Sequence, residues 1–200
     1  MKLIFATGNA GKLREAREIL GPAGIEVLSP YDLGLTKEQV EVEETGSSFE
    51  ENAIIKVKNI WNLTGLPCFA DDSGLVVDAL GGAPGIYSAR YASLDGSGED
   101  HNFASNIDRL LHELQGVTDR RARFRCVVAL MLSEEIKVFN GNCEGKIALS
   151  RAGCGGFGYD PVFIPVAFPD RTIAEMDENA KNAISHRGDA LRKMLKAIQL

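Results

Sequence analysis

The sequence predicts a single α/β domain over residues 1–200, with a strand–helix first part and an antiparallel meander in the middle. The composition, 44% hydrophobic and 25% charged, is that of one domain with a sizeable core. Two patterns give the class. An apolar run at residues 3–6 leads into an amphipathic helix, and residues 121–132 begin as an alternating strand and become wholly apolar. The sequence shows no internal repeat, low-complexity segment or linker between independent domains.

The first strand, at residues 3–6, is followed by a loop with the features of an anion site. A helix N-terminus after a glycine-containing loop directs backbone N–H groups and the helix dipole at that loop, and Lys12 adds a full charge. A P-loop would need glycine at Ala6 and Ser or Thr at Leu13. If this loop binds phosphate, it therefore lacks the hydroxyl that binds magnesium in a P-loop, and any metal must be held elsewhere. The alternative is a plain tight turn. The candidate phosphate-binding residues are Thr7, Gly8, Asn9, Ala10, Gly11 and Lys12.

An acidic segment at residues 38–44 follows the second predicted strand (25–28) and a loop. It ends in Glu43 and Glu44, which are candidate metal ligands. The alternative is a solvated acidic loop with a favourable contact to the dipole of the next helix.

The next helix should begin at Ser48, because Ser48 and Glu51 have the spacing of a capping box. Asn52 and Lys56 lie four residues apart on it and share one face. Another face should point inward with Phe49, Ala53, Val57 and Ile60 or Trp61.

Two adjacent carboxylates follow the short apolar run at residues 68–70, which has the pattern of a strand end. Paired acids at the rim of a core are costly unless a charge offsets them, and a divalent cation does so well. Asp71 and Asp72 therefore form one candidate metal cluster with Glu43 and Glu44. The alternative is a solvated turn, since Asp, Ser and Gly are ordinary turn residues.

The middle of the chain adds loops and strands. Arg90, between two aromatic residues, would touch a ligand or pair with an internal carboxylate, and residues 95–100 should form a polar loop. An apolar stripe from Phe103 to Leu114 predicts an amphipathic helix that ends at Gly116. Beyond the strand at 121–132, a strand at 136–139 and a further one should be separated at Gly141–Asn142.

Residues 153–158 fit the pattern G-x-G-x-x-G, but a strand at 159–165 is predicted to follow instead of a helix. The segment is therefore not a dinucleotide fingerprint. A backbone-exposing loop with Phe157 and Tyr159 would suit the close approach of a flat ring. The alternative is a glycine-rich turn with core aromatics.

Three basic side chains lie near the C-terminus. Lys181 belongs to a short predicted helix at 177–184, and His186 and Arg187 precede the last helix. Positive charge at a helix start opposes the dipole, which indicates an anionic or carbonyl-rich partner.

Charge and cysteine content exclude some classes of protein. A net charge of −6 argues against a protein that coats nucleic acid, so we expect no nucleic-acid partner. The four cysteines have no Cys-x-x-Cys spacing, which favours reduced thiols over disulfides or zinc. The apolar run near the N-terminus is too short for a signal peptide or membrane span, so we expect a cytoplasmic protein with no membrane partner.

Together these segments resemble the signature blocks of the inosine triphosphate pyrophosphatase family, which hydrolyses dITP, ITP and XTP. The resemblance spans nearly the whole chain in the family's order. Its one mild departure is Ser48, where the family usually has threonine. The blocks lie at residues 7–12, 44–53, 70–74, 81–90, 155–161 and 183–188.

The resemblance implies an α/β fold with a long twisted mixed central sheet, helices on both sides and two lobes that flank a nucleotide cleft. It also implies a Mg²⁺-dependent homodimer that cleaves non-canonical purine nucleoside triphosphates to the monophosphate and pyrophosphate. Asp72 would be the general base and a metal ligand, supported by Asp71 and by Glu43 or Glu44. The substrate would contact the loop at 7–12 and Lys56, Ser73, Phe157, Gly158, Tyr159, Asp160, Lys181, His186 and Arg187.

Two other functions are alternatives. A regulatory protein that senses a nucleotide without cleaving it would not need a base beside the metal, so the Asp pair argues against it. A hydrolase of the related septum-inhibitor family would share the fold, but the segment Ser185-His186-Arg187 argues against that family. The sequence leaves open the preference among ITP, dITP and XTP.

Overall fold

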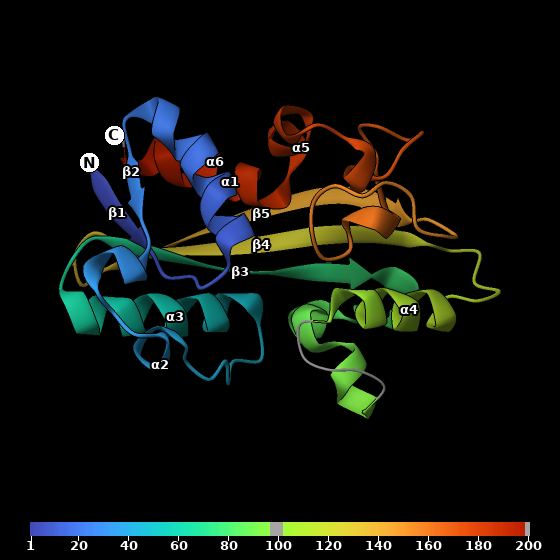
Figure 1. Ribbon diagram of the computed structural model, residues 1–200, viewed down its shortest axis with the longest axis horizontal. Coiled ribbons are helices and arrows are strands. Elements are labelled where there is room, and N and C mark those ends of the chain that lie inside the picture. Colours follow the sequence, from blue (N-terminus) through green and yellow to red (C-terminus); the bar gives the residue numbers. More distant parts are fainter. Residues whose placement is uncertain (97–101, 199–200) are drawn as a thin grey trace. The chain divides into compact units, whose positions relative to one another are not determined.

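The computed structural model describes residues 1–96 and 102–198 of the chain, and these residues form a six-stranded mixed sheet with helices (Figure 1). Strand β1 pairs in parallel with β2 and β3, whereas β5 and β6 are antiparallel. The order across the sheet is β2-β1-β3-β4-β5-β6. This confirms the predicted α/β class. The strands are β1 (Lys2–Phe5), β2 (Glu26–Leu28), β3 (Cys68–Val77), β4 (Arg121–Met131), β5 (Ile136–Ile147) and β6 (Phe163–Pro165).

The chain divides into two compact units, each built from separate segments. Unit 1 comprises Met1–Asp72, Cys126–Gly141 and His186–Leu200, and unit 2 comprises Ser73–Arg125 and Asn142–Ser185. Strands β3, β4 and β5 therefore contribute residues to both units.

In unit 1, helices α1 and α6 lie on one face of the sheet and α3 lies on the other (Figure 1). Buried side chains of β1, α1, β4 and α6 form one apolar cluster, in which the rings of Phe5 and Phe69 stack with centroids 4.4 Å apart. The predicted stripe of α3 is confirmed, with Ile60 and not Trp61 buried. The helices of this unit are α1 (Ala10–Leu20), α2 (Lys37–Val40), α3 (Phe49–Thr64) and α6 (His186–Ile198).

Unit 2 has its own apolar cluster, in which α4 packs against β3, β4 and β5 through side chains such as Leu75, Leu110 and Phe124. Its helices are α4 (Phe103–Glu113) and α5 (Glu178–Ile184). The short 3₁₀ turns of the chain are Gly21–Ala23, Pro30–Leu33, Asp78–Leu80, Gly85–Arg90, Ala92–Asp95, Asp160–Val162 and Ile173–Glu175.

The prediction that a strand ends at Ala70 is wrong. Strand β3 continues without a break to Val77, through the two aspartates and through Ser73 and Gly74. The turn propensity of these residues is outweighed because both carboxylates are buried against cationic side chains, which a solvated turn would not provide.

The predicted separation of two strands at Gly141–Asn142 is also wrong, since β5 is continuous from Ile136 to Ile147. Gly141 serves close packing instead of a turn. A Cβ atom at this position would lie 2.0 Å from the carbonyl oxygen of His186 and 2.5 Å from the nitrogen of Ala190.

Two smaller predictions also change. The loop and acidic segment before α3 contain a 3₁₀ turn and the short helix α2. The strand predicted at 159–165 shrinks to β6, because Pro161 lies in a 3₁₀ turn just before it. Arg90 lies over the ring of Tyr87, 5.4 Å from its centroid. Of the predicted polar loop, residues 97–100 lie outside the described part of the chain.

All four cysteines are free thiols, as predicted, and Cys154 is the exposed one. Among the helices within residues 1–96 and 102–198, none has both the length and the apolar composition needed to cross a bilayer.

Candidate active site

Asp71 and Asp72 lie side by side on β3 in unit 1 and are 2% and 6% exposed. Consecutive residues of a strand point to opposite faces of the sheet. Asp71 accordingly meets side chains from α1 and α6, whereas Asp72 meets side chains from α3. The two carboxylates therefore have different environments.

Asp71 is held by two cations. Lys12 Nζ donates to its Oδ1 atom at 2.9 Å, and Arg187 Nε donates to its Oδ2 atom at 2.9 Å. Arg187 Nη1 also donates to the buried carboxylate of Glu15. Burial alone would raise the pKa of Asp71, but Lys12 and Arg187 together hold it well below its usual range. Asp71 is therefore a fixed negative charge at neutral pH and not a proton acceptor.

The pKa of Asp72 is shifted in the opposite direction, above its ordinary value. Burial raises the pKa of Asp72 by more than the neighbouring ammonium of Lys56 lowers it. Lys56 Nζ donates to Asp72 Oδ1 at 3.0 Å and to Glu44 Oε1 at 2.8 Å. Burial would lower the pKa of Lys56, but these two carboxylates raise it above the ordinary value. A buried carboxylate whose pKa is raised is a better proton acceptor than an ordinary Asp, so Asp72 has the environment of a general base.

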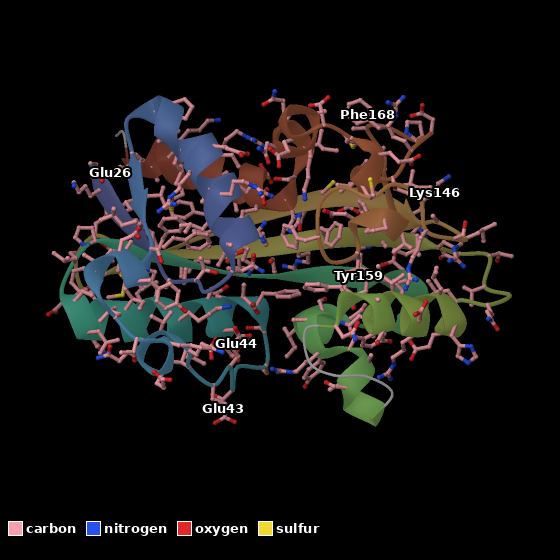
Figure 2. All side chains as sticks on the ribbon, in the orientation of Figure 1. Glu26, Glu43, Glu44, Lys146, Tyr159 and Phe168 are labelled. Carbon is pink, nitrogen blue, oxygen red and sulfur yellow. The ribbon has the colours of Figure 1, made fainter. Side chains whose placement is uncertain are left out.

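Of the two glutamates before α3, only Glu44 contacts Lys56 in the described interactions. Figure 2 shows Glu43 extending away from α3, and this side chain is exposed. The loop at 43–46 is also held closely against α3, because a Cβ atom at Gly46 would lie 2.5 Å from Asn52 Oδ1. The structure thus distinguishes two residues that the sequence treated alike.

The loop after β1 ends in a capped helix start. Helix α1 begins at Ala10, so part of the predicted loop belongs to its first turn. Asn9 Oδ1 accepts from Lys12 N at 3.0 Å, and Thr7 Oγ1 accepts from Asn9 N at 3.1 Å. The first turn of α1 contains no acidic residue. The positive end of the helix dipole therefore lacks a carboxylate of its own turn, which suits an anionic ligand.

The four predicted metal-cluster carboxylates do not gather in one place. Within the described residues, no three His, Cys, Asp or Glu side chains are arranged to hold a metal ion by themselves. Asp72 and Glu44 remain as a pair around one ammonium, at 3.0 and 2.8 Å. Mg²⁺ typically takes one or two protein carboxylates and completes its shell with water and substrate phosphates. The donor pair therefore fits Mg²⁺.

Unit 2 contains a second polar cluster, formed by the glycine-rich segment and α5. Asp160 is 5% exposed, and its Oδ2 atom accepts from Phe157 N at 2.9 Å and from Lys181 Nζ at 2.6 Å. Lys181 Nζ also lies 4.7 Å from the centroid of the Phe157 ring. Gly156 has φ +73°, and a Cβ atom there would lie 2.0 Å from Asp160 Oδ2, so only glycine fits. The segment thus holds a lysine against an aromatic face.

The two aromatic residues of this segment differ. Tyr159 is 3% exposed, and its hydroxyl donates to Ser88 O at 2.9 Å. Tyr159 therefore has the surroundings of a core residue, as one of the two alternatives held, whereas Phe157 is half-buried. Gly158, at the turn between them, has φ +63°.

The remaining predicted residues have varied environments. Ser73 and His186 are both half-buried. Arg187 is 1% exposed, with its donors on Asp71 and Glu15. That position favours support of Asp71 over direct reading of a base, and the base-reading role stays a prediction.

Glu15 is the partner that the sequence reasoning missed. It is 6% exposed on α1 and pairs with Arg187. The signal was present, because Glu15 lies four residues before Ile19 and hence on the apolar side of the predicted helix. A charged residue on such a face needs a buried partner.

A mixed α/β sheet that buries an aspartate pair between lysines, beside a helix whose first turn has no acidic residue, has the features of a protein that binds a polyanion. The Ham1 family model matches residues 3–197, and the chain belongs to this family. It is 50% identical over 196 residues to the dITP/XTP pyrophosphatase of Bacillus licheniformis, covering 96% of this chain and 95% of that protein. It is 47% identical to the dITP/XTP pyrophosphatase of Shigella flexneri, covering 99% and 98%. These relatives confirm the resemblance inferred from the sequence.

Solved structures of similar proteins have the same fold as this chain. The Ham1 protein of Staphylococcus aureus superimposes with a TM-score of 0.85 at 40% identity, covering 100% of this chain and 98% of that one. A dITP/XTP pyrophosphatase from Mycobacterium abscessus gives a TM-score of 0.75 at 43% identity, covering 98% and 99%.

Proposed function

We propose that this chain hydrolyses dITP, ITP and XTP to the nucleoside monophosphate and pyrophosphate, which removes them before incorporation into DNA or RNA. The observation that carries the proposal is the Asp72 carboxylate, which lies 3.0 Å from Lys56 Nζ and whose pKa is raised by burial in spite of that ammonium. The names of the relatives support the choice of substrate.

The chemistry requires an activated water and neutralised phosphates. Water attacks the α-phosphorus and loses a proton to Asp72 as the new P–O bond forms. The bond from the α-phosphorus to the bridging oxygen breaks, and pyrophosphate leaves with that oxygen. Lys12, Lys56 and the N-terminus of α1 supply positive charge for a triphosphate, which lowers the cost of charge on the leaving group.

We propose Mg²⁺ as the cofactor, held by Asp72 and Glu44. A bound Mg²⁺ would neutralise phosphate charge and polarise the phosphorus–oxygen bonds. Asp71 contributes through its charge, because Lys12 and Arg187 already occupy its oxygens. We assign no direct contact with the metal to Glu43, which is exposed.

Base selection is proposed for the cluster of unit 2. Hypoxanthine and xanthine carry a carbonyl at C6, where adenine carries an amino group, and an ammonium can only donate. Lys181 is such a donor, and the ring of Phe157 offers a stacking face. A missing hydrogen-bond partner in a buried site costs about 1–3 kcal/mol, so ATP should be disfavoured by roughly a hundredfold.

The proposed partners are the nucleotide and a second copy of the chain, as the family resemblance implies. The proposed location is the cytoplasm, in keeping with cysteines that are all free thiols.

The function is tested by measuring pyrophosphate release with Mg²⁺ from ITP, dITP, XTP, ATP, GTP and dTTP. We expect release from the first three and little from ATP, whose base carries an amino group at C6. Equal release from all six would contradict the proposed base selection. No release from any, with nucleotide binding intact, would favour the sensor alternative.

A further inference from the structure

We propose that Asn52 is a positioning residue that fixes the Asp72 carboxylate and ties it to the loop carrying Glu44. This inference rests on the proposed function, in which Asp72 accepts the proton of the attacking water. It assigns a task to a residue that has no substrate or metal contact in that scheme.

Asn52 joins two parts of unit 1 that are distant in sequence. Its side chain is fully buried. The Nδ2 atom donates to Asp72 Oδ2 at 3.3 Å, and the Oδ1 atom accepts from Gly46 N at 2.8 Å. A single amide therefore spans from the proposed base on β3 to the loop that carries Glu44.

The two partners fix the orientation of the amide. The N–H group of Gly46 can only donate, so the amide oxygen must face it. An ionised Asp72 can only accept, so the amide nitrogen must face the carboxylate. A rotation of the Asn52 amide by 180° would oppose two donors on one side and two acceptors on the other. The Asn52 amide thus has a single orientation, with its oxygen toward Gly46 and its nitrogen toward Asp72.

The fixed amide also gives the two carboxylate oxygens of Asp72 different partners. Asn52 and Lys56, one helical turn apart on α3, bind Oδ2 and Oδ1 respectively. Lys56 also binds Glu44, so Oδ1 is the oxygen on the side of the second proposed metal ligand. Oδ2 is held by a neutral amide that need not move. The two bonds fix the plane of the Asp72 carboxylate and keep Oδ1 on the side of Lys56 and Glu44, where the proposed metal would be held.

The loop is fitted to this arrangement. A Cβ atom at Gly46 would lie 2.5 Å from Asn52 Oδ1 and 2.9 Å from Asn52 N, so glycine allows the backbone to reach the amide. Asparagine is also a poor choice for a helix interior on propensity alone. A fully buried amide at this position is explained by the two bonds that it makes.

The test uses three variants on the same helix. Asn52→Asp keeps the shape and the acceptor for Gly46 N–H but loses the donor to Asp72. Asn52→Ala loses both bonds. Asn59→Ala is the matched control, because Asn59 donates only to Gln39 O in the described structure, away from Asp72. For each variant we would measure kcat and KM with dITP, the thermal midpoint, and Mg²⁺ binding by calorimetry without nucleotide.

We expect both Asn52 variants to lower kcat by about 10–100-fold, with KM within about threefold of the parent. We also expect Asn52→Ala to weaken Mg²⁺ binding by about tenfold, because Glu44 and Asp72 lose their common support. Asn59→Ala should match the parent in all four quantities. A parental kcat in Asn52→Asp, or a fall in activity carried by KM alone, would overturn the inference.

Failure of the proposed function would give a different result. In that case the parent protein itself releases no pyrophosphate, and the Mg²⁺ affinities of the parent and Asn52→Ala still decide the inference. Equal affinities would overturn it, and a weaker affinity in Asn52→Ala would support it. If Asn52→Ala does not fold, Asn52→Asp decides through the split between kcat and KM.

Discussion

Replacing Asp72 by Asn should lower turnover by about two to four orders of magnitude, with the fold intact. The amide keeps the shape of the carboxylate but cannot accept a proton from water at neutral pH. It also removes one of the two carboxylates that flank Lys56. The expected loss is therefore in kcat for every substrate and not in the choice among bases.

The measurement is steady-state pyrophosphate release by Asp72→Asn and by the control Asp170→Asn. Asp170 is an exposed aspartate paired with Arg171 in unit 2, so the control removes a carboxylate without touching the site. The control should retain parental turnover. Near-parental turnover in a folded Asp72→Asn protein would remove Asp72 from the role of general base.

Replacing Asp71 by Asn should lower the free energy of unfolding by about 3–5 kcal/mol at neutral pH. The substitution leaves the buried guanidinium of Arg187 and the ammonium of Lys12 without their shared carboxylate. Removing one partner of a buried ion pair is costly because the remaining charge stays desolvated.

This loss should depend on pH in one direction. The pKa of Asp71 is lower in the folded state than in the unfolded chain, where it is about 4. Its stabilising contribution is thus complete above about pH 4 and is lost as the pH falls toward the folded-state pKa. The stability gap between the parent and Asp71→Asn should be full at pH 7 and shrink in acid.

Urea unfolding of the parent, Asp71→Asn and Asp170→Asn across this pH range tests the prediction. Asp170→Asn should follow the parent at neutral pH, since its ion pair is at the surface. A gap between the parent and Asp71→Asn that stays constant into acid would show that the lost stability comes from packing and not from the charge of Asp71.

Local patterns sufficed for most of the fold. The strand at residues 3–6, the helix that begins after Ser48 and the amphipathic helix after residue 103 were predictable because their apolar periodicity sets the buried face. The same patterns failed at β3, where the local preference of Asp71-Asp72-Ser73-Gly74 for a turn opposes the tertiary structure. The cations that offset Asp71 lie 59 and 116 residues away in the sequence.

For the candidate site, too, part could be predicted from residue types and part depends on tertiary contacts. The sequence predicts Lys12 and Lys56 as phosphate-binding residues and Asp72 as the general base. The structure brings Lys56 Nζ within 3.0 Å of Asp72, and these roles stay predictions. The sequence could not separate Glu44 from Glu43, because the difference depends on which side chain of the loop meets Lys56. Nor could it show the burial of Arg187, which depends on Glu15 of a helix 172 residues away.

Hydrolysis of dITP in ¹⁸O-labelled water tests the central claim most directly, because it shows which phosphorus the water attacks. The account predicts one ¹⁸O atom in the nucleoside monophosphate and none in pyrophosphate, since the water activated by Asp72 attacks the α-phosphorus. Label in the pyrophosphate would mean attack at the β-phosphorus and would contradict the proposed mechanism.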